Sequence, residues 1–155
     1  MAKRESAGKA PKASRSLEQE AYLSLQRTAD LLARGVEEAI KPEGLSATQH
    51  NVLRILRGAG PNGLCCREVA ERMLTRDPDI TRLLDRLERR GLAARARASA
   101  DRRIITVRIM PAGMRILAKL DKPIAECHGR QLTHLGPRRL QQLIDLLNSA
   151  RVTSG

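Results

Sequence analysis

The sequence predicts a mainly α-helical protein with one small two-stranded β-sheet. Apolar residues recur at helical spacing over most of the chain between residues 17 and 151. Two short stretches, 92–97 and 104–109, read instead as strands separated by a loop. Glycine and proline interrupt the helical pattern between these segments, so we expect several separate helices rather than one long rod.

Length and composition are those of a single domain with an aliphatic core. The chain has 155 residues, of which 41% are hydrophobic, but it contains no Trp, no Phe and one Tyr. The core must therefore consist of Leu, Ile, Val, Ala and Met. No run approaches 18 apolar residues, so neither a signal peptide nor a membrane-spanning helix is expected. Three cysteines make no disulfide framework, which fits a protein of the reducing cytoplasm.

The positive charge is concentrated in one part of the chain. The net charge is +12, and residues 76–108 carry ten arginines against five acidic residues. Residues 16–75, in contrast, carry seven basic against eight acidic residues. A dense positive segment favours a polyanionic partner. Because these cations are all arginine, they are suited to bidentate contacts with phosphate and guanine.

The N-terminal part begins with a basic segment and continues as a long helix. Residues 1–15 have no apolar period, and we expect a disordered basic arm. This arm is either a solvated tail or a source of non-specific DNA affinity. Residues 17–41 have the pattern of an amphipathic helix, which Pro42 and Gly44 end.

The next two helices are marked by their first residues. Ser46 and Gln49 form a capping-box pattern at the start of a helix that ends near Gly58. After a turn at 61–63, Cys65 takes the N-cap position of a second helix, where Ser or Thr is usual. We expect a weak cap there, with partial compensation by Glu68.

A short break at residues 74–76 leads to the most informative helix. Asp77 is the expected N-cap, Pro78 the first helical residue and Asp79 part of the first turn. Gly91 is the expected C′ residue. The apolar stripe is Ile80, Leu83, Leu84 and Leu87, and another face carries Asp79, Arg82, Arg86 and Arg89. Helix, short turn and helix is the arrangement that lays its second helix in a DNA major groove.

The predicted strands follow, with a basic tip at Asp101-Arg102-Arg103. A basic hairpin beside a helix-turn-helix is a wing. From Pro111 a further long helix is expected, and a break at 135–137 separates it from a last helix over 137–151. That last helix is expected to bury Leu140, Leu143, Ile144 and Leu147.

These motifs resemble the MarR family of winged-helix transcription regulators. The resemblance rests on the stretch 81–92 (TRLLDRLERRGL), on the Asp-x-Arg of the wing tip and on residues 109–113 (IMPAG). Ile109 and Met110 stand where the family usually has Leu and Thr. The resemblance implies a winged helix-turn-helix head at residues 45–110, with dimerisation helices at 16–44 and 111–151. It further implies a homodimer on a pseudo-palindromic DNA operator, most often as a repressor.

Roles for the basic head follow from helix geometry and, for the wing, from the resemblance. We call the second helix of the predicted helix-turn-helix the reading helix. Near its start, Asp79 and Arg82 are placed to reach base edges. The residues suited to phosphates are Thr75, Thr81 and Arg86, while Arg76 could contact either. Arg103, next to Arg102 at the tip, matches the family's minor-groove arginine, and Asp101 is expected to hold it in position.

The resemblance also implies a small-molecule effector bound between the dimerisation helices and the head. Tyr22, His50 and Arg54 lie on helices that could line such a pocket. With neither Phe nor Trp in the chain, a flat aromatic ligand would find few stacking partners. No cofactor is expected.

Catalysis and metal binding are not indicated. The three histidines lie in helical context, and no nucleophile motif or glycine-rich phosphate loop is present. Cys127 and His128 are adjacent on a helix and diverge by about 100°, so they do not readily share an ion.

Three alternatives remain open. Cys65 and Cys66 flank a helix N-terminus, where the dipole favours a thiolate, so the protein could be a redox-sensing regulator. The second alternative is a non-specific architectural DNA binder. The third is a protein-interaction module that uses the winged fold without nucleic acid, against which the arginine-rich head and the Asp-x-Arg motif argue.

Overall fold

The computed structural model describes residues 15–76, 79–97 and 103–152, and these form two units. The first unit ends at Leu31 and the second begins at Leu32. Helix α1 (Leu17–Ile40) runs through that boundary. The expected basic arm lies outside the described residues, apart from Arg15, which is exposed.

The first unit consists of the beginning of α1. Ser16 and Gln19 cap it reciprocally: the Ser16 hydroxyl accepts from the Gln19 N–H, and the Gln19 side chain accepts from the Ser16 N–H, both at 3.3 Å. The apolar stripe that the sequence shows here has no cover within the unit, and Leu17, Tyr22 and Leu31 are all exposed.

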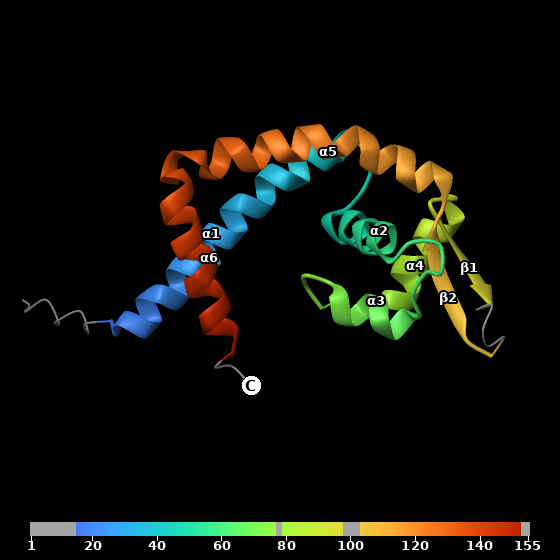
Figure 1. The fold of residues 1–155 in the computed structure, drawn as a ribbon, viewed down its shortest axis with the longest axis horizontal. Coiled ribbons are helices and arrows are strands. Elements are labelled where there is room, and N and C mark those ends of the chain that lie inside the picture. The colour runs from blue at the N-terminus through green and yellow to red at the C-terminus, as the bar shows by residue number, and fades with distance from the viewer. Residues whose placement is uncertain (1–14, 77–78, 98–102, 153–155) are drawn as a thin grey trace, which may run out of the picture. The chain divides into compact units, whose positions relative to one another are not determined.

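The second unit contains the head, which is assembled from short elements (Figure 1). After α1 comes a 3-10 turn, η1 (Lys41–Glu43), followed by α2 (Ala47–Ala59) and α3 (Cys66–Arg72). The expected capping box of α2 is confirmed, since Ser46 Oγ accepts from the Gln49 N–H and the Gln49 side chain accepts from the Ser46 N–H. Helix α4 (Ile80–Arg89) completes the helix-turn-helix.

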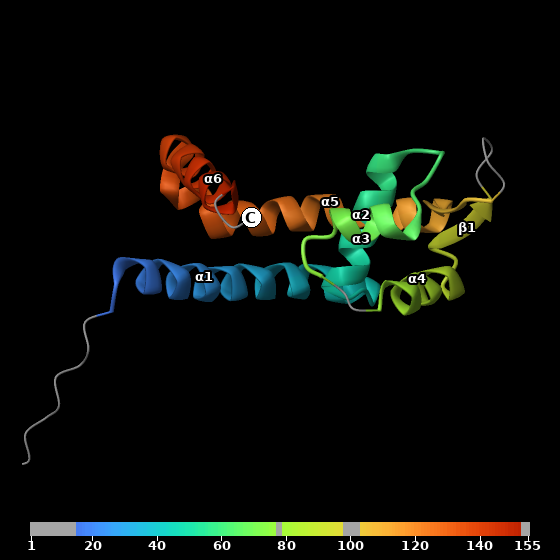
Figure 2. The ribbon, with the colours of Figure 1, turned by 90° about the horizontal axis from the view of Figure 1, so that it is seen from below.

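The wing is an antiparallel hairpin of β1 (Ala93–Arg97) and β2 (Ile105–Ile109), beside α4 in Figure 2. The segment before α3 also joins this sheet, because Leu64 and Val107 exchange backbone hydrogen bonds of 3.0 and 2.7 Å. Gly63 makes this approach possible. Its φ is +68°, and a Cβ there would collide with the Val107 carbonyl.

The core of the head is aliphatic, as expected. Its most deeply buried side chains come from the end of α1 and from α2, α3, α4, β2 and α5, and they are Ile40, Val52, Leu53, Leu56, Val69, Leu84, Leu87, Val107 and Leu117. Complete burial of side chains of this size stabilises a fold by about 1.5–3 kcal/mol each before entropic costs. The reading helix is therefore held by the same core that holds α2.

The last elements are α5 (Pro111–Leu132), a 3-10 turn η2 (Thr133–Leu135) and α6 (Gly136–Val152). Helix α5 packs on α2 and continues through Pro123. The prediction that α6 buries its leucine stripe within the chain is wrong, since no described residue of α6 is buried and Ile144 is half exposed. Among the described residues Leu140, Leu143 and Leu147 are partly buried and Ile144 is exposed, so the stripe is only partly covered. No helix in the described ranges has the length and apolarity to cross a membrane.

Candidate nucleic-acid interface

The reading helix begins two residues later than the sequence suggested. Asp79 is its N-cap rather than a member of its first turn, with a non-helical backbone and a carboxylate that accepts from the Arg82 N–H at 3.1 Å. Asp77 and Pro78, the expected cap and first residue, lie outside the described residues. Asp79 accepts from the Arg82 N–H at position N3, as an N-cap does, so the sequence offered both Asp77 and Asp79 as caps.

Helix α4 has two distinct faces. Leu83, Leu84 and Leu87 are buried and Ile80 is partly buried, which confirms the expected apolar stripe. The polar positions, Thr81, Arg82, Arg86 and Arg89, are all exposed, as are Thr75 and Arg76 in the turn before the helix. Arg82 Nε lies 3.0 Å from the Asp79 carboxylate, so a DNA-facing role for Arg82 requires that exposed ion pair to open or be shared.

The helix ends as expected from Gly91. The Gly91 N–H donates to the Glu88 carbonyl and the Leu92 N–H to the Leu87 carbonyl, both at 2.9 Å. With φ +68° at Gly91, this is a Schellman motif. It turns the chain directly from α4 into β1, which places the wing next to the reading helix.

The tip of the wing is described only at its end. Arg103 is exposed in the turn before β2. Asp101 and Arg102 fall outside the described residues, so the expected contact between Asp101 and Arg103 stays a prediction.

Arg95 joins the wing to helix α4 through contacts that the sequence did not predict. It lies on β1, and its guanidinium contacts Asp85 at 2.7 Å and Glu88 at 2.5 Å, both on α4. The only available sequence signal was an arginine in a strand following two acids spaced three residues apart on a helix, and this pattern does not specify a contact.

Arg90 is a second anchor that the sequence did not reveal. Its guanidinium donates to the carbonyls of Gly44 at 2.8 Å and Glu43 at 3.0 Å. Glu43 also faces Lys119 of α5 at 3.6 Å. The end of α4 is thereby tied to the turn that follows α1.

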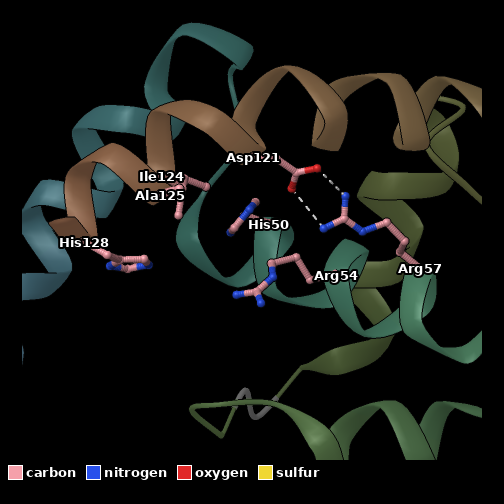
Figure 3. Close-up of a pocket in the computed structure, with 7 residues that line it drawn as sticks. All are labelled: His50, Arg54, Arg57, Asp121, Ile124, Ala125 and His128. Atoms are coloured by element: carbon pink, nitrogen blue, oxygen red, sulfur yellow. Dashed lines mark hydrogen bonds and ion pairs between the residues drawn. The ribbon is translucent and has the colours of Figure 1, made fainter. Parts of the chain in front are cut away.

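A small cavity lies between α2 and α5 (Figure 3). Its volume is about 180 Å³, and it is lined by His50, Arg54, Arg57, Asp121, Ile124, Ala125 and His128. Arg57 and Asp121 form a bidentate ion pair of 2.9 and 3.0 Å across it. A neighbouring cavity of about 270 Å³ shares His50 and Arg54 and extends to Val36, Leu74 and Thr75. Two expected pocket residues, His50 and Arg54, therefore come together.

The electrostatics of this cavity favour an uncharged His50. Burial lowers the pKa of His50, and the positive charges of Arg54 and Arg57 lower it further. The hydrogen bonds from Arg57 lower the pKa of Asp121. Since Asp121 neutralises Arg57, and Arg54 makes no hydrogen bond or ion pair with any described residue, Arg54 is the available cation of the cavity.

Tyr22, the third expected pocket residue, is part of the first unit. It lies on the first part of α1, where it lines a shallow hollow with Arg15, Gln19 and Leu23. Its role in the effector pocket therefore stays a prediction.

The structure describes both cysteines for which redox sensing was predicted. Cys65 and Cys66 are free and partly buried, and the Cys65 N–H donates to the Glu68 carboxylate at 2.8 Å, which opens α3. Redox sensing by these thiols remains a prediction. The described residues contain no cluster of three His, Cys, Asp or Glu that could hold a metal ion.

Known proteins with a similar sequence or structure have the same winged helix-turn-helix. Residues 43–104 fit the family model of the MarR family. The crystal structure of a MarR transcription factor from Planctomyces limnophilus is 44% identical, with TM-score 0.65, over 87% of this chain and 98% of that one.

Two relatives come from Bacillus subtilis. The transcriptional regulator YkoM is 30% identical over 74% of this chain and 73% of its own length. The transcriptional repressor MdtR is 33% identical over 59% of this chain and 57% of its own length. With a helix-turn-helix, a two-stranded wing and these relatives, the chain belongs to the MarR family of DNA-binding winged-helix transcription regulators.

Proposed function

We propose that the protein is a sequence-specific repressor that binds a pseudo-palindromic operator as a homodimer and is released by a small molecule bound near His50 and Arg54. The proposal rests on the reading helix α4, which has one buried apolar face and one exposed face that carries arginines. Its leucine stripe is fixed in the core, so the opposite arginine face is presented outward in one orientation. One relative, MdtR, is a repressor, which supports repression rather than activation.

The reading of DNA is assigned by position. Arg82, in the first turn of α4, is suited to a base edge, with Asp79 beside it. Thr75, Thr81 and Arg86 suit phosphates. Arg103 of the wing suits the minor groove, with Asp101 and Arg102 at the same tip, and Arg76 suits either kind of contact.

The homodimer is supported by uncovered apolar surface. Leu17 and Leu31 on α1, and Ile144 and Leu146 on α6, are half or more exposed within the chain. Large apolar side chains left exposed on these helices are what a second copy of the chain would cover. A two-fold partner would set two reading helices about 34–36 Å apart, the spacing of successive major grooves.

Effector binding is supported by the chemistry of the cavities. His50 is 6% exposed, and its ring makes no hydrogen bond with any described residue. Beside it stand the available cation of Arg54 and the apolar side chains of Val36 and Ile124. The larger cavity also reaches Leu74 and Thr75, just ahead of α4, so an occupant would contact the turn of the helix-turn-helix.

The test compares operator with random DNA across a salt series. Replacing Arg82 with Ala should weaken operator binding by about 1–3 kcal/mol and relax preference at one position in each half-site. Removing residues 1–15 should weaken binding to all DNA alike and flatten the salt dependence, because fewer counterions are released.

Equal losses on operator and random DNA for Arg82→Ala would count against a specific regulator and favour an architectural DNA binder. Peroxide provides a separate check on the thiols. Reversible loss of operator binding, abolished by Ser at Cys65 and Cys66, would instead identify a redox-sensing regulator.

A further inference from the structure

Arg95 occupies a strand position at which an apolar residue would be expected. It pairs with Val107 across the hairpin, and Val107 is 1% exposed. Directly paired residues of an antiparallel sheet have their side chains on the same face, so Arg95 stands on the face that meets the core. A charge there is costly unless it has partners.

Among the described residues, the partners of its side chain lie on the reading helix. Besides the two ion pairs with Asp85 and Glu88, the Arg95 backbone N–H donates to the second oxygen of Glu88 at 3.0 Å. Glu88 thus holds both the main chain and the side chain of one wing residue. These contacts, the backbone hydrogen bond foremost, lower the pKa of Glu88 and keep it ionised.

Such a network contributes more to geometry than to stability. A partly buried ion triad is often no more stabilising than apolar side chains of the same volume. The planar guanidinium, however, meets two carboxylates in one orientation only. Because Asp85 and Glu88 are on α4 and Arg95 is on β1, the triad restricts rotation of the wing about the reading helix.

We propose that Arg95 is a positioning residue for DNA recognition, whose fork to Asp85 and Glu88 holds the wing at the angle at which Arg82 and Arg103 engage neighbouring grooves of one duplex. This inference rests on the proposed function. The same fork neutralises carboxylate charge on a helix that approaches phosphates, which a bound polyanion would otherwise repel.

The experiment uses the full chain and a duplex that the wild-type protein selects from a random pool. Versions of that duplex carry A·T-rich or G·C-rich flanks, and a scrambled duplex measures non-specific binding. Two variants are compared with the wild type. Arg95→Lys keeps the charge and removes the fork, while the triple change Arg95→Met, Asp85→Asn and Glu88→Gln removes the charges together and leaves no unpaired ion.

In both variants the Kd for the selected duplex should rise about tenfold, while that for scrambled DNA should change less than about twofold. The wild-type preference for A·T-rich flanks should fall to the level of Arg103→Ala, because a wing at the wrong angle no longer reaches the minor groove. Adding Arg103→Ala to Arg95→Lys should weaken binding to the selected duplex little further, since both changes remove the same contact.

Lys122→Met, which breaks an exposed ion pair on α5, is the control and should leave the flank preference unchanged.

A merely structural role predicts a lower Tm and equal losses on all DNAs with the flank preference intact, and that result would overturn the proposal. Unfolding of both variants would overturn it too, because the triad would then hold the head together rather than orient the wing. If the wild-type protein selects no sequence at all, the specific-regulator function fails, a result distinct from either outcome for Arg95.

Discussion

In the head, Leu53, Leu56, Leu84 and Leu87 are almost completely buried, whereas along α6 no described residue is buried, although that helix is also rich in leucine. Both segments have amphipathic sequences, and both form regular helices. They differ in what lies against them: the helices of the head meet one another, the hairpin and α5, whereas α6 contacts mainly η2.

The difference separates two uses of an apolar stripe. In the head the stripe closes a core within one chain, so its residues determine whether the domain folds. On α6 no residue of the stripe is fully buried by the described part of the chain, which leaves apolar surface that a second copy could cover. A change of leucine should therefore affect folding in one region and assembly in the other.

The largest effect is expected in the head. Replacing Leu56 with Ala removes a fully buried side chain and leaves a cavity, so the free energy of unfolding should fall by about 2–5 kcal/mol. Leu146→Ala on α6, where the side chain is 69% exposed, should change it by less than about 0.5 kcal/mol. Urea unfolding of both variants, followed by circular dichroism, measures the contrast, and equal losses would erase the distinction between the regions.

The next effect is on assembly. Glu at both Leu143 and Leu147 would place charge on the predicted dimer stripe, and burying an unpaired charge costs several kcal/mol. Light scattering should then give one chain mass, 17.1 kDa, instead of twice that value, while the head keeps its thermal transition.

Gln142→Glu adds a carboxylate to an exposed position of the same helix, away from those leucines, and should leave the assembly intact. A wild-type protein that scatters as a single chain at micromolar concentration would remove the basis for assigning α6 to an interface.

The smallest effect is expected from pH. The folded state holds the pKa of His50 below its ordinary value of 6.5, so the unfolded chain binds the proton more readily. This contribution is complete above about pH 6.5 and is lost as the pH falls through the lower folded value. Asp121, whose pKa is lowered by Arg57, adds a further loss only below 3.8.

Between pH 7.5 and 5.5 the Tm should therefore fall, because protonation of His50 favours the unfolded chain over this range. His50→Gln should flatten this slope, and His134→Gln, at an exposed position, should not. An unchanged slope in His50→Gln would show that another group carries the pH dependence.

Local signals in the sequence predicted most of the elements. The capping box of Ser46 and Gln49 and the left-handed Gly91 both depend on neighbours within a few residues, and both were found as expected. The start of α4 was missed because Asp77 and Asp79 both have the chemistry of a cap. The choice between them depends on how the preceding turn packs, which periodicity does not encode.

The long-range contacts could not be predicted. Arg57 meets Asp121 across 64 positions, and Arg90 meets Gly44 across 46. The sequence around either arginine predicts only a charged side chain in water. Its partner is far away in the sequence and comes near only when the helices pack. The burial of α6 failed for a related reason: a stripe at helical spacing predicts an apolar partner but not whether the partner belongs to the same chain.

The exposure of Tyr22 on α1 has an optical consequence. With no tryptophan in the chain and a single tyrosine, the intrinsic ultraviolet emission of the protein arises from one ring on the uncovered first part of α1. That emission would report on whatever covers the first part of α1. Leu74 is 82% exposed in the turn before the reading helix. Because the chain has no other tryptophan, the fluorescence of a Leu74→Trp variant would report on that turn alone.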